Sequence, residues 1–353
     1  MIVLFFFFVL SLLLTAVSNT RNQSKFFFLI VLCISIISFF YAPTESADLY
    51  KHYANIEFYG DMGLDWILEN RTNLNPLTHL LLYVFSFVGE PRLFSSFCTF
   101  ITYGFSLLLL HRASKFFSLN KLEIVLLMMF LLFNWNYLLV ASNCRIFMLY
   151  AIVAYFFYME FVEDRSHKTA LVVYLASILF HYGILLVVLP RFLLYFYKPT
   201  NKIVYLLAVI VIVVLTYTGG SNYEKIFLDS VLDKVEGYKD YKTFGKLQFL
   251  NSLIVVLMCC FYAIKKRFYL MDIKRFSLIF WLITILIFLQ ISNFQIIYRE
   301  SNLIVSLSVV LFSQVLSKDK DYTMLQIIAL QSIISLIYSF IYVYPYIDFI
   351  FVI

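Results

Sequence analysis

The chain has 353 residues, of which 63% are hydrophobic and only 14% are charged. Soluble domains carry roughly 45–50% apolar and about 25% charged residues, so this apolar excess excludes a single globular core. The net charge of +6 does not indicate nucleic-acid binding, because the Lys and Arg residues lie in short segments between apolar runs, where they set membrane orientation.

The hydrophobic residues gather in runs along the whole chain, many of them near the roughly 20 residues that a helix needs to cross a bilayer. The runs cover residues 2–17, 26–41, 76–89, 92–110, 122–141, 146–162, 169–197, 203–218, 247–264, 276–292, 301–316 and 323–343. Continuous runs of this length favour helices, because a backbone in hydrocarbon must satisfy its own hydrogen bonds. The sequence therefore predicts an all-α, polytopic integral membrane protein with roughly 11–13 membrane helices in one domain, residues 1–353. The first run lacks a basic leader and a small-residue cleavage site, so it is predicted to be a retained helix.

Charge sets the orientation of these runs. The most basic connection is Lys265–Arg275, which we place in the cytoplasm. Counting outward from it places further segments on the cytoplasmic side at residues 21–25, 111–121, 164–168, 198–202 and 318–321. The outer segments are then residues 42–75, 142–145, 219–246 and 293–300.

This alternation requires two irregular runs. Residues 169–197 must cross twice, with a break near His181-Tyr182-Gly183. Residues 76–89 must not cross, and this run of about 14 apolar residues is short for a span. It is predicted to form a re-entrant or surface helix on the outer face. The alternative is an ordinary hairpin, which would place the basic stretch around Lys115 and Lys121 outside.

The segment 42–75 is one of the few hydrophilic parts of the chain, and it is acidic and rich in Tyr. We expect it to be a loop in water, around which a catalytic or recognition surface is built.

Several other kinds of site are not indicated. The cysteines form no CxxC motif, and four of the five lie in apolar runs, so neither a disulfide framework nor a zinc site is expected. No P-loop, GxGxxG, HExxH or GxSxG pattern is present.

A set of short motifs follows one another along the first half of the chain. They are Asp48-Leu-Tyr50 with Tyr53, Asn75-Pro76-Leu77 opening a short apolar helix, Arg145 opening another, the loop Asp164–Lys168, and Leu179-Phe180-His181 ending a helix. This order resembles the EpsG-like and O-antigen polymerase (Wzy) families of bacterial polysaccharide assembly, over roughly residues 45 to 190. The chain departs from that pattern at Asn75, where these families usually have a glutamate, and at Tyr182-Gly183, where they have a pair of small residues.

The resemblance implies a glycosyltransferase-type enzyme in the bacterial inner membrane, with its active face on the periplasmic side. Such an enzyme takes a glycan from an undecaprenyl-pyrophosphate donor and joins it to an acceptor sugar on another lipid-linked unit. The donor carries its own leaving group, so no cofactor and no metal are expected. The implied partners are the two lipid-linked glycans, membrane lipid and a chain-length regulator protein, with no nucleic acid.

Two arginines fit the binding of the pyrophosphate. Arg145 and Arg299 each open a helix from the outer side, where unpaired N–H groups and the guanidinium both favour an anion. The plainer interpretation of Arg145 is an interfacial arginine that reaches the headgroups. Arg299 has the neighbours Tyr298 and Glu300, which are alternative partners for it.

His181 and Asp48 are the acid and base candidates. His181 lies inside an apolar run, where an ionisable group is a functional hypothesis, and it would take the acceptor proton or assist the departing phosphate. Its structural alternative is bonding to backbone carbonyls at the bend. Asp48 would act on the acceptor hydroxyl, or it is simply a helix cap. Candidate substrate-binding residues are Tyr50, Tyr53, Arg71 and Tyr298.

Two other functions stay open. A lipid-linked oligosaccharide flippase would place charges around a central cavity, whereas the polar residues here lie at the outer rim. A polyprenyl-phosphate-dependent transferase of single sugars would use a carboxylate in the first outer segment, which Asp48 also suits.

Overall fold

The computed structural model describes residues 22–43, 48–70, 75–135, 137–181, 183–195, 242–265, 273–289, 294–318, 322–338 and 350–351. Its helices are α2 (Gln23–Phe39), α3 (Asp48–Asn70), α4 (Pro76–Ser86), α5 (Arg92–Phe116), α6 (Lys121–Asn134), α7 (Tyr137–Ser142), α8 (Cys144–Phe161), α9 (His167–Phe180), α10 (Ile184–Tyr195), α13 (Lys242–Lys265), α14 (Lys274–Leu289), α15 (Phe294–Lys318) and α16 (Tyr322–Tyr338). The strands β1 (Tyr41–Ala42) and β2 (Ile350–Phe351) form an antiparallel pair. The predominantly helical prediction is confirmed for this part of the chain. The predicted runs 2–17 and 203–218, and most of the segment 219–246, lie outside it.

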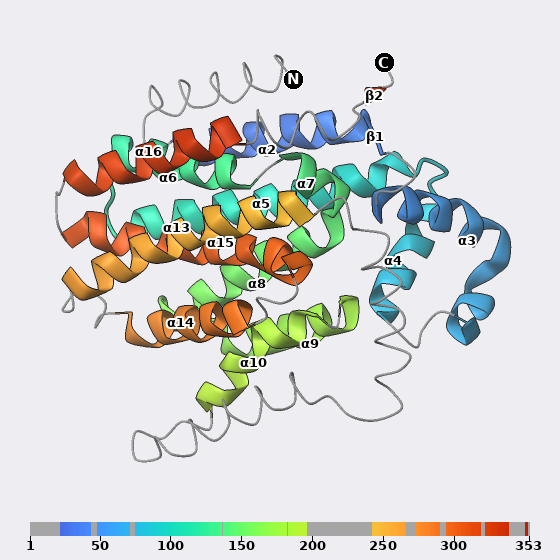
Figure 1. Ribbon diagram of the computed structural model, residues 1–353. Coiled ribbons are helices and arrows are strands. Elements are labelled where there is room, and N and C mark those ends of the chain that lie inside the picture. The colour runs from blue at the N-terminus through green and yellow to red at the C-terminus, as the bar shows by residue number, and fades with distance from the viewer. Residues whose placement is uncertain are drawn as a thin grey trace.

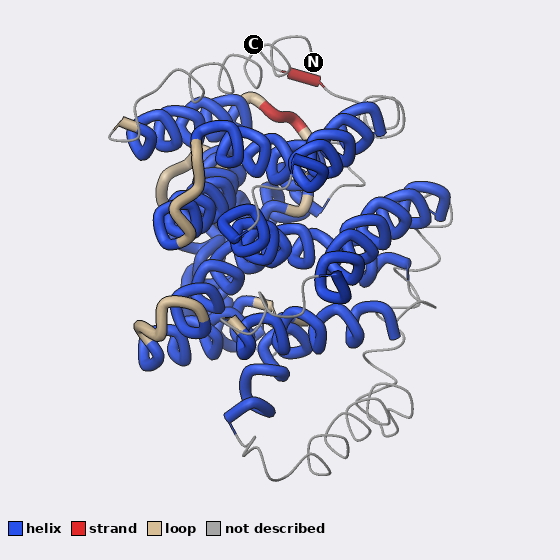
Figure 2. The backbone as a smooth tube through the Cα atoms, turned by 90° about the vertical axis from the view of Figure 1, so that its left-hand side faces the viewer, coloured by secondary structure: helices blue, strands red, loops and turns tan. Residues whose placement is uncertain are grey.

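Most of these helices lie side by side in one bundle, with α3 and α4 gathered at its right-hand end in Figure 1. The turned view of Figure 2 shows the same helices, with the strand pair at one edge. Helix α5 packs against both α2 and α8, α13 packs against α15, and α6 packs against α16. Hydroxyl groups support the α2–α5 contact, since Ser35 and Ser96 bond to each other and Ser38 bonds to Thr99. Small polar residues of this kind let two helices approach closely.

Contacts at the two ends of the bundle fix the direction of the first helices. Phe27 of α2 meets His111 near the end of α5, whereas Phe39 at the end of α2 lies against Arg92 at the start of α5, so α2 and α5 run antiparallel. Arg112 pairs with Glu163, which follows α8. Helices α5 and α8 therefore run parallel. The segments predicted to be cytoplasmic, 111–121 and 164–168, meet at this end.

The hydrophilic segment 42–75 is not the open loop that we expected, because most of it is the 23-residue helix α3. Its buried residues Leu49, Ile56, Tyr59 and Ile67 recur at helical spacing, so one side of the helix packs against the rest of the molecule. The helix is bent at Gly63, whose φ of 78° and ψ of 167° interrupt the helical backbone. The acidic composition concealed an amphipathic helix.

The charge pattern predicts irregularities in two apolar runs, 76–89 and 169–197. The short helix α4 lies in the first of these runs, and the break after α9 lies in the second. With 11 residues, α4 is about 16 Å long at 1.5 Å per residue, too short for a bilayer core of about 30 Å. Pro76 occupies its first turn, where the missing N–H costs nothing. Helix α9 ends at Phe180 and α10 begins at Ile184, and the Thr78 hydroxyl of α4 donates to the Phe180 carbonyl over 2.6 Å.

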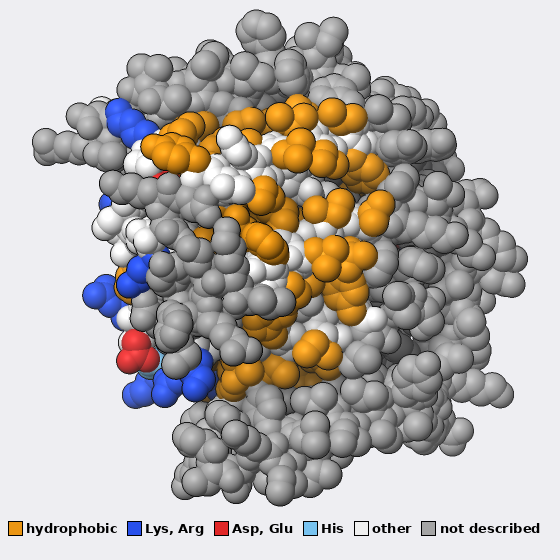
Figure 3. Space-filling model, turned by 60° about the vertical axis from the view of Figure 1, so that its left-hand side comes forward, with side chains coloured by type: hydrophobic (Ala, Val, Ile, Leu, Met, Phe, Trp, Pro, Cys, Tyr) orange, Lys and Arg blue, Asp and Glu red, His pale blue; other side chains and the backbone are white. Residues whose placement is uncertain are grey.

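Two of the described helices, α5 and α8, are long and apolar enough to cross a membrane. Shorter apolar helices accompany them, at Gln23–Phe39, Pro76–Ser86, His167–Phe180, Leu250–Tyr262, Asn302–Lys318 and Tyr322–Tyr338. Large apolar side chains are exposed on several sides of the bundle. They include Phe28, Leu29, Leu32 and Ile36 of α2, Val172, Leu175 and Leu179 of α9, Leu250, Leu257 and Phe261 of α13, and Leu330, Ile333, Ile334 and Ile337 of α16. Figure 3 shows one apolar face, with Lys and Arg along one edge.

A buried amide cluster, formed by Asn134, Asn251, Gln331 and Ser335, joins α6, α13 and α16. Asn251 donates to the Asn134 side-chain oxygen over 2.9 Å, and Gln331 donates to the Asn251 side-chain oxygen over 2.6 Å. The Ser335 hydroxyl lies 2.8 Å from the Asn134 oxygen and 3.0 Å from the Asn251 oxygen. All four side chains are buried. The cluster therefore fixes how the C-terminal helices sit on α6.

Candidate functional site

The parallel course of α5 and α8 brings their first turns to the same end of the bundle. The Cys98 thiol in α5 contacts the thiol of Cys144, the first residue of α8, and Arg145 lies within electrostatic range of Cys98. A helix start has unpaired N–H groups and a partial positive charge, which favour an anion. Each of the two helices carries an arginine in its first turn, Arg92 in α5 and Arg145 in α8, and we call this end of the bundle the rim.

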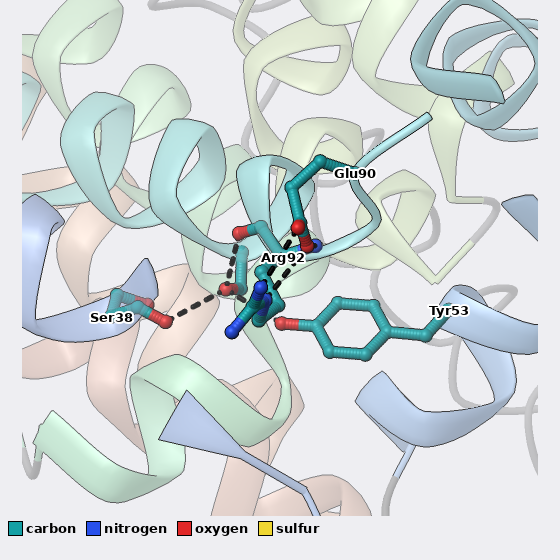
Figure 4. A network of polar contacts seen from close by, with 5 residues as sticks. Ser38, Tyr53, Glu90 and Arg92 are labelled. Carbon is teal, nitrogen blue, oxygen red and sulfur yellow. Dashed lines mark hydrogen bonds and ion pairs between the residues drawn. The ribbon is translucent and has the colours of Figure 1, made fainter. Parts of the chain in front are cut away.

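Tyr53 connects α3 to this rim, as Figure 4 shows. Its hydroxyl donates to the Ser95 hydroxyl over 2.9 Å. The Ser95 hydroxyl lies 3.0 Å from each of the Ser38 and Arg92 carbonyl oxygens, so it donates to one of them at a time. Burial raises the pKa of Tyr53 well above its usual range, because the phenolate would lose its solvation. Tyr53, a predicted substrate-binding residue, is thus in contact with the bundle and holds α3 over its end.

Arg92 is held by the carboxylate of Glu90, a residue that the sequence alone did not single out. Its guanidinium makes two hydrogen bonds to Glu90, 2.7 Å from Nε to Oε1 and 2.8 Å from Nη2 to Oε2, and lies 4.9 Å from the Phe39 ring centre. The hydrogen bond from Arg92 lowers the pKa of Glu90 below its usual value. Both side chains are about one-third exposed, at 33% for Glu90 and 36% for Arg92, so the pair is accessible from outside the protein. The available signal was the turn Gly89-Glu90-Pro91-Arg92, which places two opposite charges between apolar runs.

His181 occupies the break between α9 and α10, and its backbone is extended, with φ of −156° and ψ of 110°. The Gly183 N–H donates to Nδ1 of His181 over 3.1 Å. In the neutral ring the proton therefore sits on Nε2, which makes Nε2 a donor and leaves Nδ1 engaged as an acceptor. Gly183 allows this arrangement, because a Cβ there would lie 2.9 Å from both Cε1 and Nδ1 of the ring. Two roles were predicted for His181, namely taking the proton of the acceptor and assisting the departing phosphate. Because Nε2 is a donor, this geometry favours the second role.

A second histidine lies on α4, close to the break. The Tyr59 hydroxyl and His79 Nδ1 are 2.6 Å apart, which links α3 to α4. The neighbouring Thr78 is the residue that bonds to the Phe180 carbonyl. Helix α4 thus connects the α3 cover to the loop that carries His181.

The remaining predicted residues lie elsewhere on α3 and α15 or outside what the structure describes. Asp48 is in the first turn of α3, where its carboxylate is favoured by the helix dipole, and Tyr50 is 42% exposed. Helix α15 begins at Phe294, so Tyr298 and Arg299 lie in its second turn and not at its start. Nothing is described of those two side chains, and Arg71 lies outside the described residues.

The chain matches no protein-family model, and no curated protein or solved structure is similar to it. Among the described residues, no group of three or more His, Cys, Asp and Glu side chains is placed to hold a metal ion.

The arrangement at this end can bind an anion and handle protons. Guanidinium groups bind phosphate in a bidentate manner, and the partial positive charge of a helix start favours an anion. A histidine donor and a solvent-accessible carboxylate complete the residue types needed for transfer from a phosphate leaving group. Arg92 lies within electrostatic range of Tyr53, Arg145 lies within electrostatic range of Cys98, and α4 is bonded to the Phe180 carbonyl next to His181.

Proposed function

We propose that this chain is a polytopic enzyme of the bacterial inner membrane that polymerises lipid-pyrophosphate-linked glycan repeat units on the outer face. The observation that carries the proposal is the pair of arginines, Arg92 and Arg145, in the first turns of adjacent parallel helices. A pyrophosphate carries several negative charges, and the two arginines lie at the same end of the bundle, where Tyr53 attaches α3.

The apolar surface supports a membrane environment. Exposed Leu, Ile, Val and Phe side chains lie on α2, α9, α13 and α16. Soluble monomers seldom expose contiguous apolar patches of more than a few hundred Å². Lipid is the environment that suits such a surface, and the two helices long enough to cross it, α5 and α8, carry the arginines at the same end.

In the proposed reaction the acceptor hydroxyl attacks the anomeric carbon of the donor while the bond to the pyrophosphate breaks. Arg92 and Arg145 stabilise the negative charge that gathers on the leaving pyrophosphate. His181, with Nε2 as its donor, assists that departure. Helices α3 and α4 form the cover under which both substrates lie.

The test is a gel of surface polysaccharide from a strain lacking this chain, complemented with wild type or variants. Wild type should restore a ladder of repeat lengths where the deletion strain shows a single-repeat band, and Arg145→Ala should not. The matched control is Arg165→Ala, which changes an exposed arginine at the opposite end of the bundle. Loss of the single-repeat band in the deletion strain would refute polymerisation and indicate export or synthesis of the repeat itself. A product longer by one sugar would indicate the single-sugar transferase.

A further inference from the structure

Among the described residues, the Glu90–Arg92 pair differs from the two other arginine–carboxylate pairs in what it connects. Arg112 with Glu163, and Arg191 with Glu160, each join different segments of the bundle. Glu90 and Arg92 are two residues apart, at the start of one helix, and each is about one-third exposed. A local pair this exposed contributes little to stability. Glu90 Oε1 also accepts the Arg92 backbone N–H over 3.2 Å, which caps α5, but this cap does not require the contact between the Arg92 guanidinium and Oε2.

The position of the pair relates it to the rim described above. Arg92 lies within electrostatic range of the Tyr53 phenol, and so does Cys144, the residue before Arg145. The guanidinium fork of Arg92 is occupied by a carboxylate, and a phosphate has the same bidentate geometry. An arriving phosphate group can therefore replace the carboxylate without a new backbone arrangement.

We infer that Glu90 is the base that accepts the proton of the acceptor hydroxyl, and that Arg92 releases it by moving onto the donor's pyrophosphate. This inference rests on the proposed polymerase function. In the paired state Arg92 masks the Glu90 oxygens. Binding of the donor therefore frees the Glu90 carboxylate to accept a proton, and in the enzyme without donor the carboxylate stays bound to Arg92. Glu90 takes the role that the sequence alone assigned to Asp48.

The acceptor oxygen forms a bond to the anomeric carbon of the donor, and its proton passes to a Glu90 carboxylate oxygen. The bond between the anomeric carbon and the phosphate oxygen breaks, and its electron pair leaves with the lipid pyrophosphate. Arg92 and Arg145 hold the resulting charge. No oxidant, reductant or additional reactant is required.

The test compares Glu90→Gln, Glu90→Asp and Arg92→Gln in purified protein. Binding of undecaprenyl pyrophosphate in detergent and polymer formation per folded molecule are measured separately. Glu90→Gln should bind the lipid as well as wild type or better, because Arg92 is no longer occupied, and should lose turnover about 100-fold or more. Glu90→Asp should recover part of that turnover. Arg92→Gln should weaken lipid binding about tenfold or more, as the loss of a charge-assisted bidentate contact does.

The matched control is Glu163→Gln, which breaks an equally bidentate pair at the opposite end and should leave lipid binding and turnover per folded molecule unchanged. Wild-type turnover in Glu90→Gln would overturn the inference, and so would a loss of lipid binding as large as that of Arg92→Gln. Recovery of turnover in Glu90→Arg combined with Arg92→Glu would show that the pair is structural. A wild-type protein that makes no polymer would refute the proposed function itself, whereas active Glu90→Gln in the presence of active wild type refutes only the role of Glu90.

Discussion

Asn251 is the centre of the buried amide cluster, and replacing it with alanine tests whether that cluster holds α13 to α6 and α16. The change removes three interhelical contacts, namely those to Asn134, to Gln331 and to Ser335. Polar contacts between helices in bilayers average about 0.6 kcal/mol each and reach about 1.7 kcal/mol. We therefore expect Asn251→Ala to lower the free energy of unfolding by about 2 kcal/mol, a factor of roughly 30 in the folded-to-unfolded ratio.

The assay is unfolding in mixed micelles with increasing denaturing detergent, followed by helix content. The control is Ser332→Ala, which removes a hydroxyl that bonds only within its own helix, to the Ile328 carbonyl, and should cost less than about 0.5 kcal/mol. A double-mutant cycle of Asn251→Ala with Gln331→Ala separates the contact from the loss of volume, and should give a coupling of about 1 kcal/mol. The reasoning is refuted if Asn251→Ala costs no more than Ser332→Ala, or if the two sites are additive.

Three further predictions concern other parts of the structure. Glu160→Gln should lower the free energy of unfolding by about 3–5 kcal/mol, because it leaves the largely buried Arg191 guanidinium without a counter-charge. The double variant Glu160→Leu with Arg191→Leu should lower it by less in the same unfolding assay, and a larger loss would contradict this prediction. Gly183→Ala should reduce polymer formation as far as His181→Ala does, because the added Cβ displaces the imidazole. The control is Gly104→Ala, which should not reduce it, because the nearest atom to a Cβ at that position is 3.9 Å away. An active Gly183→Ala protein would exclude a role for the ring position. The pKa of Glu90 is lowered from 4.5, the usual value for a glutamate. The small stabilisation from its ion pair is therefore fully present above pH 4.5, and it is lost as the pH falls through the lowered pKa. Melting curves of wild type and Glu90→Gln should therefore converge in acid, and a constant separation at every pH would show that the pair does not titrate.

The sequence was informative about the bundle and less so about its outer end. Long apolar runs and the position of Pro76 are local signals, so the helices, the short α4 and the break at His181 were predictable. The acids of α3 outweighed its apolar residues in composition, although Ile56, Tyr59 and Ile67 already had helical spacing. An amphipathic helix was therefore taken for a loop.

The partners at the rim depend on tertiary contacts that no single sequence shows. Arg145 stood out because an arginine interrupts an apolar region at an outer boundary. Arg92 did not, because the parallel packing of α5 with α8 is not visible in the sequence. Nothing local distinguishes Tyr53, whose hydroxyl bonds to Ser95, from Tyr50, which is exposed.

The hydrogen bond between Thr78 and the Phe180 carbonyl joins two segments that are 102 positions apart in the chain. The chain leaves the helical path after Phe180, and a backbone carbonyl at such a break needs a donor from outside its own helix. In the membrane orientation that we propose, the donor comes from the short helix α4, which does not cross the bilayer. An α4 that crossed instead would carry Thr78 away from the break, and the turn at His181 would lose this contact.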